Sequence, residues 1–409
     1  MSKRESSLGA TAAADYDVVV VGGGLAGQLC VLALAARAPS MSVALVEHRS
    51  RLGGSQTWCC HRSDLTIPAV NPSLFSWFSP LVDTRWSGYQ VRFPGFVREI
   101  EGEYLCLRSQ SLARATEQSL SRPRCQLLTQ RTATALADDR VILADGQTLR
   151  ARLVLDARGG ELARFERRAG YQKFVGWEID VEAGHKVPVL PVLMDATVPQ
   201  VDGYRFVYTL PFSPTRLLVE DTYFSRTSDL DIASVRNRLH AHLHAIGLDQ
   251  HTLVREEVGI LPMPWAGQDV NVEPLALGYR GGFFHPGTAY SLPRAAWVAD
   301  RLAQVAATVE PSKLAAQAIE ALDQLRSSWR ADDRFARLLN RLAFRAWAPE
   351  RLRDAVFAPV YRLPSAVLAR FYAGRTSLGD RLAIAAAPTR LSRFRRTAEP
   401  TPAPAWRSP

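Results

Sequence analysis

The stretch from Asp17 to Glu47 constrains the fold of this chain more than any other, because it predicts a strand, a tight turn, a helix and a second strand. Val18 to Val21 form a continuous apolar run, which is typical of a strand buried on both faces of a parallel sheet. A helix is predicted from Leu25 to Ala38 and a second strand from Val43 to Val46. The stretch therefore predicts a βαβ unit of a Rossmann-like α/β domain.

The turn of this unit carries three glycines spaced as G-x-G-x-x-G. Gly22 permits the tight turn, Gly24 lets the backbone approach a pyrophosphate, and Gly27 lets the helix pack closely on the strand. Phosphate groups would sit at the positive end of the helix dipole. Glu47 ends the second strand twenty residues after Gly27, where a carboxylate can accept a hydrogen bond from a ribose hydroxyl. The spacing predicts a dinucleotide site.

Two other interpretations of this stretch are a βαβ unit without a nucleotide and a signal anchor. The interrupting glycines, Gln28 and Arg37 argue against an anchor. The fingerprint occurs once, since Gly278 to Gly282 does not repeat it. One fingerprint favours a single tightly held dinucleotide, with any second nucleotide binding transiently.

Composition favours a globular protein with a large core, since the chain has 409 residues and 47% hydrophobic content. The five cysteines form no C-x-x-C pair, which fits a reducing cytosol. We find no run long enough for a transmembrane helix. His240 and His244 share a helix face, but no acid completes a zinc pattern, so no metal site is predicted.

The net charge of +10 is concentrated near the carboxyl end. Fourteen arginines and three acidic residues lie from Arg334 to Arg396, so this segment carries +11 and the remainder is close to neutral. We therefore expect no nucleic-acid partner. Aromatic residues and leucines interleave with the arginines, which predicts an amphipathic region that can lie on an anionic bilayer. A helical cap with a solvated arginine face is the alternative.

The rest of the chain predicts further strands. A hairpin is expected around Asp145-Gly146, followed by a buried strand that ends at Asp156. Antiparallel strands of a second sheet are predicted at Val187 to Leu193, Tyr204 to Leu210 and Leu217 to Val219, with a turn from Pro211 to Pro214 between the last two.

Several long blocks follow one another along the chain besides the fingerprint with Glu47. They are GGSQTW (53–58), YQVRFP (89–94), LDARG (155–159), MDATV (194–198), GYRFVYTLPFSPTRLLVEDT (203–222), REEVGILPM (255–263), FFHPGTAYSLP (283–293) and RFYAGRTSLGDRL (370–382). In this order, from about Tyr16 to Leu382, they resemble the bacterial lycopene β-cyclases. The fingerprint and the Asp156/Gly159 motif are also typical of the wider group of flavoprotein hydroxylase-like proteins. Gly287 and Ala289 depart from a family pattern closer to HPTTGYS.

The resemblance implies FAD, reduced by NAD(P)H, and a non-redox cyclisation of lycopene through γ-carotene to β-carotene. Lycopene and related carotenes are the expected substrates. The expected location is the cytoplasm, peripherally attached to the inner face of the cell membrane. Cofactor contacts are assigned to Gly22, Gly24, Gly27, Glu47, Gly53, Gly54, Asp156, Gly159, His285 and Pro286.

The fold class that follows is α/β, with a Rossmann-like FAD-binding domain interleaved with an antiparallel-sheet substrate domain and a C-terminal helical region. The expected ranges are a disordered leader (1–14), the FAD-binding domain (15–70, 105–165, 270–330), the substrate domain (71–104, 166–269), a basic helical region (331–398) and a Pro-rich tail (399–409).

The implied chemistry needs a carboxylic acid that stays protonated in a dry pocket, because lycopene has no heteroatom to activate. Glu220 and Asp221 follow an apolar strand, and adjacent strand residues face opposite sides, so one carboxyl can face a pocket. Glu220 and Asp221 are the candidate catalytic residues, and the resemblance places the role of general acid or cation stabiliser on Glu220. Solvated turn acids are the alternative, and Asp195 is a weaker candidate.

A competing hypothesis is an FAD-dependent monooxygenase or desaturase of an apolar substrate. It shares the fingerprint, Glu47 and Asp156, but it requires net electron transfer. The sequence leaves open whether one or both ends of the substrate are cyclised, whether Glu220 or reduced flavin delivers the proton, and the oligomeric state.

Overall fold

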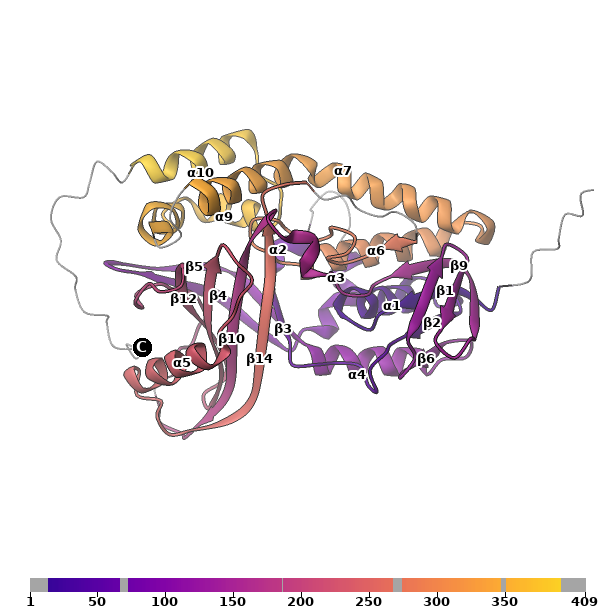
Figure 1. Cartoon of the computed structure of the whole chain (residues 1–409), viewed down its shortest axis with the longest axis horizontal. Helices are drawn as coiled ribbons and strands as arrows, with labels where there is room; N and C mark the ends of the chain where they lie inside the picture. The colour runs from indigo at the N-terminus through magenta and orange to yellow at the C-terminus, as the bar shows by residue number, and fades with distance from the viewer. Residues whose placement is uncertain (1–13, 67–72, 186, 268–273, 347–350, 391–409) are drawn as a thin grey trace, which may run out of the picture.

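The computed structural model describes residues 14–66, 73–185, 187–267, 274–346 and 351–390. Two sheets lie side by side, and a long helix, α7 (Leu314–Arg341), runs along both (Figure 1). All but one residue of the predicted leader, and all of the predicted tail, lie outside the described residues.

The first sheet has the strand order β6-β2-β1-β9-β8-β7, and β15 also pairs with β9. Its strands are β1 (Tyr16–Val21), β2 (Val43–Val46), β6 (Gln126–Leu128), β7 (Ala133–Ala137), β8 (Arg140–Leu143), β9 (Thr148–Asp156) and β15 (Leu275–Ala276). β1 pairs in parallel with β2 and β9, with Val21 opposite both Val46 and Asp156. The predicted βαβ unit and the hairpin before β9 are therefore confirmed.

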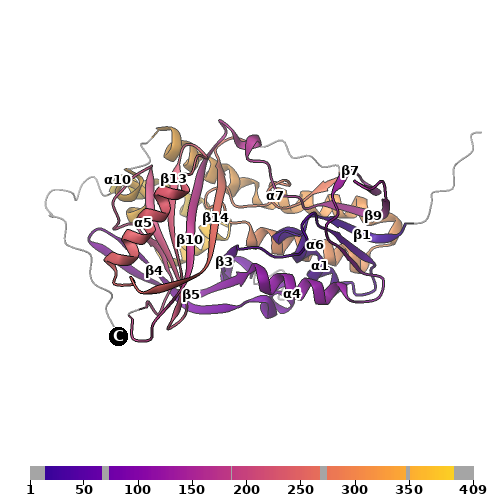
Figure 2. The same ribbon diagram turned by 60° about the horizontal axis from the view of Figure 1, so that its bottom comes forward.

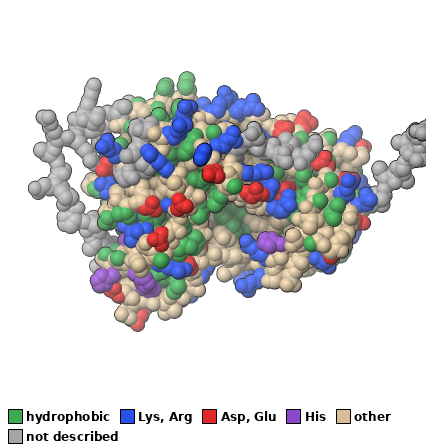
Figure 3. Space-filling model, viewed as in Figure 1, with side chains coloured by type: hydrophobic (Ala, Val, Ile, Leu, Met, Phe, Trp, Pro, Cys, Tyr) green, Lys and Arg blue, Asp and Glu red, His purple; other side chains and the backbone are tan. Residues whose placement is uncertain are grey.

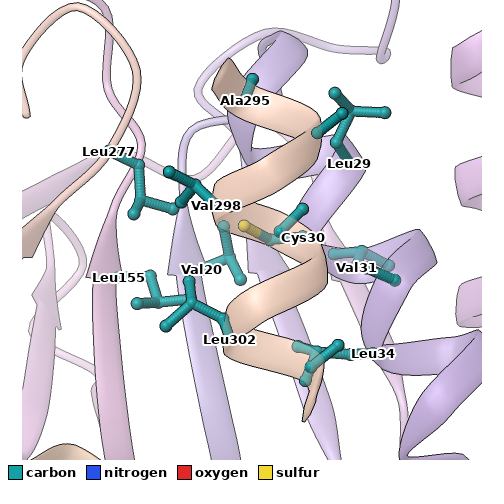
Figure 4. Close-up of a cluster of buried hydrophobic side chains, with 14 of the residues drawn as sticks. Val20, Leu29, Cys30, Val31, Leu34, Leu155, Leu277, Ala295, Val298 and Leu302 are labelled. Atoms are coloured by element: carbon teal, nitrogen blue, oxygen red, sulfur yellow. The ribbon is translucent and has the colours of Figure 1, made fainter. Parts of the chain in front are cut away.

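Three helices cover the first sheet, namely α1 (Leu25–Arg37), α4 (Ser109–Leu120) and α6 (Leu292–Thr308). Figure 4 shows α1 and α6 contributing apolar side chains to one cluster with Val20 and Leu155 of the sheet. Leu29 and Leu302 within it are at most 2% exposed. Truncating such a side chain to alanine typically costs about 2–5 kcal/mol of stability. This core holds the turn between β1 and α1 in place.

The second sheet has eight strands in the order β14-β10-β13-β12-β11-β4-β5-β3. They are β3 (Thr57–His61), β4 (Thr84–Phe93), β5 (Phe96–Arg108), β10 (Ala169–Val181), β11 (Val192–Asp195), β12 (Tyr204–Ser213), β13 (Arg216–Ser225) and β14 (His251–Pro264). All neighbours pair antiparallel except β11 and β4, which are parallel.

The two faces of this sheet have different partners because side chains alternate along each strand. One face packs against α5 (Ile232–Ala245) through residues such as Val219 and Tyr223. The other face packs against the C-terminal helices through residues such as Phe206 and Phe224. Figure 2 shows α5 across one side of the strands, with α7 and α10 on the other.

The C-terminal region after α7 is helical, as predicted. It contains π-helical turns at Leu342–Ala346 (η4) and Arg353–Phe357 (η6), then α8 (Ala358–Val360), α9 (Ser365–Tyr372) and α10 (Leu378–Arg390). Short helices elsewhere are α2 (Arg62–Leu65), α3 (Ser73–Phe78), η1 (Ser79–Leu81), η2 (Leu162–Phe165) and η3 (Pro311–Lys313). Among the described residues, no helix combines the length and hydrophobicity that crossing a bilayer requires.

Two predicted elements of the second sheet differ from the structure. β11 begins only at Val192, after Pro188 and Pro191, because proline has no N–H for a strand ladder. The predicted turn at Pro211 to Pro214 is wrong at its start, since β12 continues to Ser213 and tolerates Pro211 beside a register shift. Both errors concern prolines.

The domain division stays a proposal. β3, within the range predicted for the FAD-binding domain, pairs with β5 in the second sheet. The chain therefore passes between the two sheets near residues 57–61 as well as near 105–109.

Candidate active site

The glycines of the turn after β1 each meet a different steric demand. Gly22 has φ +110°, and a Cβ there would lie 2.6 Å from the carbonyl oxygen of Ala157. A Cβ on Gly27 would lie 2.0 Å from the carbonyl oxygen of Gly22, so helix and turn touch. A Cβ on Gly24 would meet no atom within 4 Å. The turn is thus packed behind and open at Gly24, which fits a phosphate group at the start of α1.

Two carboxylates border this turn. Glu47 Oε2 accepts a hydrogen bond from the Gly23 N–H at 2.7 Å, and Oε1 accepts one from Arg49 N–H at 2.9 Å. Asp156 ends β9 beside Val21 and accepts from Arg158 Nε at 2.9 Å and Nη2 at 2.8 Å. The structure therefore brings Glu47 and Asp156 to the glycine turn. Gly159 follows in an open stretch, since a Cβ there would meet no atom within 4 Å.

The other residues assigned to the cofactor lie in two loops. Gly53 has φ +92°, and the Gly54 carbonyl accepts from Ser109 Oγ at 2.7 Å at the start of α4. His285 and Pro286 precede α6, and Asn340 of α7 donates to the Pro286 carbonyl at 2.8 Å. Burial lowers the pKa of His285 to about 3, so its imidazole is neutral near pH 7.

A cavity of about 580 Å³ lies between the second sheet and the C-terminal helices. Its lining is mainly apolar and aromatic. Phe206 and Phe224 contribute from the sheet, and Leu339, Leu368 and Phe371 contribute from the helices. The loop before α6 also borders it, from Gly287 to Leu292, directly after His285 and Pro286. Such a lining binds a hydrocarbon through burial of apolar surface.

Glu220 lies on β13 and faces this cavity. Its side chain is buried, and its nearest charged neighbours include Glu257 and Arg255 of β14. Burial, together with the Glu257 carboxyl, raises the pKa of Glu220 well above its usual range. The arrangement provides a protonated carboxylic acid at the wall of an apolar cavity.

Asp221 is on the opposite face of β13 and does not line the cavity. Its carboxylate accepts from Arg205 Nε at 2.7 Å and Nη2 at 3.0 Å, and from the Tyr223 hydroxyl at 2.5 Å. Asp195 also lies outside the lining, where it accepts hydrogen bonds from the N–H and Oγ1 of Thr197. Of the three acidic candidates, the structure places only Glu220 at the cavity.

Sequence reasoning missed a group of tyrosines in the cavity wall. The Tyr104 hydroxyl lies 3.1 Å from that of Tyr208 and 3.5 Å from that of Tyr290. Burial raises the pKa of all three, so they remain neutral phenols. Tyr208 stands directly opposite Glu220 in the strand register. The alternation of Tyr204, Phe206 and Tyr208 could have signalled an aromatic face, but not its position beside Glu220.

Comparisons with known proteins agree on a family and a fold. Residues 17–397 match the family described as Lycopene cyclase protein. Lycopene beta-cyclases of a Paracoccus species and of Pantoea ananas are each 40% identical over 90% of this chain, covering 93% and 94% of those proteins. A chloroplastic lycopene beta cyclase of Arabidopsis thaliana is 28% identical over 39% of this chain and 34% of its own length.

Among solved structures, a geranylgeranyl bacteriochlorophyll reductase-like protein of Thermoplasma acidophilum aligns with a TM-score of 0.60 at 15% identity, over 92% of this chain and 98% of that one. A probable FAD-dependent monooxygenase of Pseudomonas aeruginosa aligns with a TM-score of 0.53 at 18% identity, over 91% of this chain and 99% of that one. At these identities the likeness concerns the fold.

Proposed function

We propose that Glu220 is the acid of this enzyme, because the chain belongs to the lycopene cyclase family and has the function of a lycopene β-cyclase. The reaction is an intramolecular isomerisation, so the protein must handle protons and a carbocation rather than a net transfer of electrons. The observation that carries the proposal is the buried carboxyl of Glu220 at the wall of an apolar cavity, where burial raises its pKa and favours the protonated form.

The cavity binds one end of the substrate by apolar contact. Lycopene offers no hydrogen-bonding group, so its affinity comes from buried surface, at about 25 cal/mol per Å². Phe206, Phe224 and Leu368 provide such surface on both sides of the cavity. Related carotenes with the same acyclic end fit this description equally well.

The proton transfers balance within one ring closure. Glu220 donates its proton to C2 of the terminal double bond, which leaves a tertiary cation at C1. The C5=C6 double bond attacks C1, so the cation moves to C5, and loss of the C6 proton gives the β ring. One proton enters and one leaves, and no electron is transferred. Tyr208 stands opposite Glu220, and Tyr104 and Tyr290 line the same cavity, so aromatic rings are available to stabilise a cation through their π electrons.

The glycine turn and its two carboxylates support FAD as the cofactor. The open cradle at Gly24 would hold the pyrophosphate, and Glu47 would accept a hydrogen bond from the ribose in addition to the one from the Gly23 N–H. Reduced FAD, supplied through NAD(P)H, would add negative charge near the cation. Gly53, Gly54, Asp156, Gly159, His285 and Pro286 remain proposed contacts.

Asp221 supports the site without touching the substrate. Its bidentate pair with Arg205 is fully buried and fixes β13 against β12, which holds Glu220 in register with Tyr208. We therefore propose a structural role for Asp221 rather than the catalytic role put forward with Glu220.

The C-terminal helices form a face that suits a membrane surface. Leu338 and Leu342 at the end of α7 are 53% and 36% exposed and also line the cavity, while Leu378 and Leu382 of α10 are 72% and 63% exposed. Figure 3 shows basic and hydrophobic side chains along this upper edge, over α7 and α10. Docking of this face on an anionic bilayer would bring an apolar substrate to the cavity and place the protein peripherally at the inner face of the cell membrane.

The reaction is tested by following hydrogen and electrons together. In D₂O, with catalytic amounts of reduced flavin, we expect each new ring to carry one deuterium at C2, with NAD(P)H consumption far below product formation. Consumption matched to product, or oxygen uptake, would instead support the monooxygenase or desaturase alternative. Rings without deuterium at C2 would contradict protonation as the initiating step.

A further inference from the structure

We propose that Glu257 is the positioning residue of Glu220, and that the two buried carboxyls share one proton across the gap left by Gly176. This inference rests on the proposed role of Glu220 as the acid. It adds a residue that sequence reasoning did not assign and that lies behind Glu220, outside the cavity lining.

The strand register brings the two carboxyls together. β10 lies between β13 and β14, and Gly176 of β10 stands opposite Glu220 on one side and Glu257 on the other. Residues directly opposite in a sheet point to the same face, so all three positions share one face. Because glycine has no side chain, both glutamates can extend over it. A Cβ at position 176 would lie 2.6 Å from Glu220 Cγ and 3.2 Å from Glu257 Cγ.

The surroundings of Glu257 fix one of its two carboxyl oxygens. Oε2 lies 2.7 Å from Arg255 Nη1 and accepts from Thr57 Oγ1 at 3.0 Å. Arg255 is itself held by Glu178 Oε2, 2.5 Å from its Nε. These contacts hold one oxygen of a side chain that is only 2% exposed, so the carboxyl of Glu257 has a fixed position beside Glu220.

The second oxygen of Glu257 has no hydrogen-bond donor, and a protonated Glu220 can supply one. Oε1 is buried and accepts from no N–H or O–H group in the part of the chain that the structure describes. The two side chains approach each other over Gly176, and a hydrogen bond with Glu257 is one cause of the raised pKa of Glu220. A protonated Glu220 therefore completes the hydrogen bonding of Glu257, and Glu257 in turn fixes where that proton points.

The pair also determines the pH at which Glu220 ionises. The titratable and charged groups that act on Glu220 include Glu257 and Arg255 of β14, Cys59 of β3 and Tyr208 of the adjacent strand β12. A second negative charge beside Glu257 is unfavourable, so Glu220 keeps its proton to higher pH, while Arg255 opposes this effect. Since the acid form is the active form, activity falls as pH rises through the pKa of Glu220.

The test is the pH profile of kcat in Glu257→Gln, measured on flavin-loaded enzyme. Glutamine keeps the size of the side chain and removes the charge, so the alkaline limb should move to lower pH by about 1 unit or more. Glu256→Gln is the matched control, because Glu256 pairs with Arg236 on the other face of β14 and its loss should leave the limb in place. An unshifted limb in folded Glu257→Gln would overturn the proposal.

A second variant separates the carboxyls without removing either. Gly176→Ala should lower kcat at least tenfold with little change in KM for lycopene, and should shift the limb in the same direction. Unchanged kcat and limb in this variant would also overturn the proposal. If Glu257→Gln does not fold, Glu257→Asp replaces it, because aspartate is one methylene shorter and moves the carboxyl away from Glu220. The alkaline limb should again move to lower pH, and an unshifted limb would overturn the proposal.

Failure of this inference is distinguishable from failure of the proposed function. An inactive Glu220→Gln together with an unshifted Glu257→Gln would leave Glu220 as the acid and remove only the shared proton. An active Glu220→Gln would remove the acid itself.

Discussion

At the scale of single residues, the site depends on what three glycines and two acidic side chains allow. Gly22, Gly24 and Gly27 act through shape, and their separate demands are those that the fingerprint predicts. The roles of Glu220 and Asp221 depend on their surroundings. They are adjacent on one strand and face opposite sides, so Glu220 lines the cavity whereas Asp221 pairs with Arg205. A sequence pattern can predict the shape that the glycines allow. It cannot predict the surroundings of the two acidic residues, because these depend on what packs against each face of the strand.

The open cradle at Gly24 predicts the effect of filling it. Gly24 has φ −79° and ψ −172°, which valine also adopts, so Gly24→Val should fold normally and lose flavin because its side chain occupies the space of the pyrophosphate. Absorbance of the purified protein measures flavin occupancy. Gly267→Val, at an exposed glycine whose Cβ would also meet nothing within 4 Å, is the matched control. Full occupancy in Gly24→Val would refute this location of the cofactor.

The buried pair of Asp221 and Arg205 predicts a loss of stability. Asp221→Asn leaves the guanidinium of Arg205, which is 5% exposed, without its counter-charge, and we expect a loss of about 3–5 kcal/mol in the free energy of unfolding. Asp180→Asn breaks a bidentate pair with Arg216 that is about 40% exposed, and should cost at most about 1 kcal/mol. Urea denaturation compares the two. Equal losses would argue against a structural role for Asp221.

At the scale of elements, prediction succeeded where the local pattern was strong. The apolar runs and glycines around α1 predict β1, α1 and β2 within one residue at each end, except for β1, which begins two residues earlier. β10 was missed, because Lys173 and Glu178 are buried there and mask the apolar pattern. That strand carries Gly176, so the pairing of Glu220 with Glu257 could not be inferred from the sequence.

The end of α7 and its continuation give the prediction for membrane docking. Arg341 and Arg345 are exposed beside Leu338 and Leu342, whereas Arg337 lies only 3.7 Å from Asp333 and is partly buried. Neutralising Arg341 and Arg345 to glutamine should weaken cosedimentation with anionic liposomes, and salt should weaken it too, since exposed charges are screened beyond about 10 Å at ~0.1 M.

The control for this experiment changes the same charge elsewhere. Arg140 of β8 and Arg150 of β9 are exposed on the first sheet, and β9 lies at the opposite end of the molecule from α9 and α10 (Figure 1), so their replacement by glutamine should leave binding unchanged. If both double variants bind alike, the arginine face is a solvated cap.

At the scale of the whole molecule, the two sheets carry different parts of the proposed site. The first sheet carries the glycine turn, the second carries Glu220 and one wall of the cavity, and the C-terminal helices line the other wall. The loop with His285 and Pro286 lies between β15 of the first sheet and α6, and continues into the cavity wall. The sequence and its family resemblance predicted the α/β fold class with a Rossmann-like domain, an antiparallel sheet and C-terminal helices. The tyrosines beside Glu220 and the course of the chain between the sheets depend on tertiary contacts that no local pattern encodes.

The most direct test of the account is the activity of Glu220→Gln in cells that accumulate lycopene, with flavin occupancy and melting temperature measured on the purified protein. Glutamine keeps the volume of the side chain and cannot donate the proton, so β-carotene should fall by roughly 10²–10⁴-fold while lycopene remains and the protein stays folded and flavin-loaded. Substantial formation of β-carotene by that folded, flavin-loaded variant would contradict Glu220 as the acid.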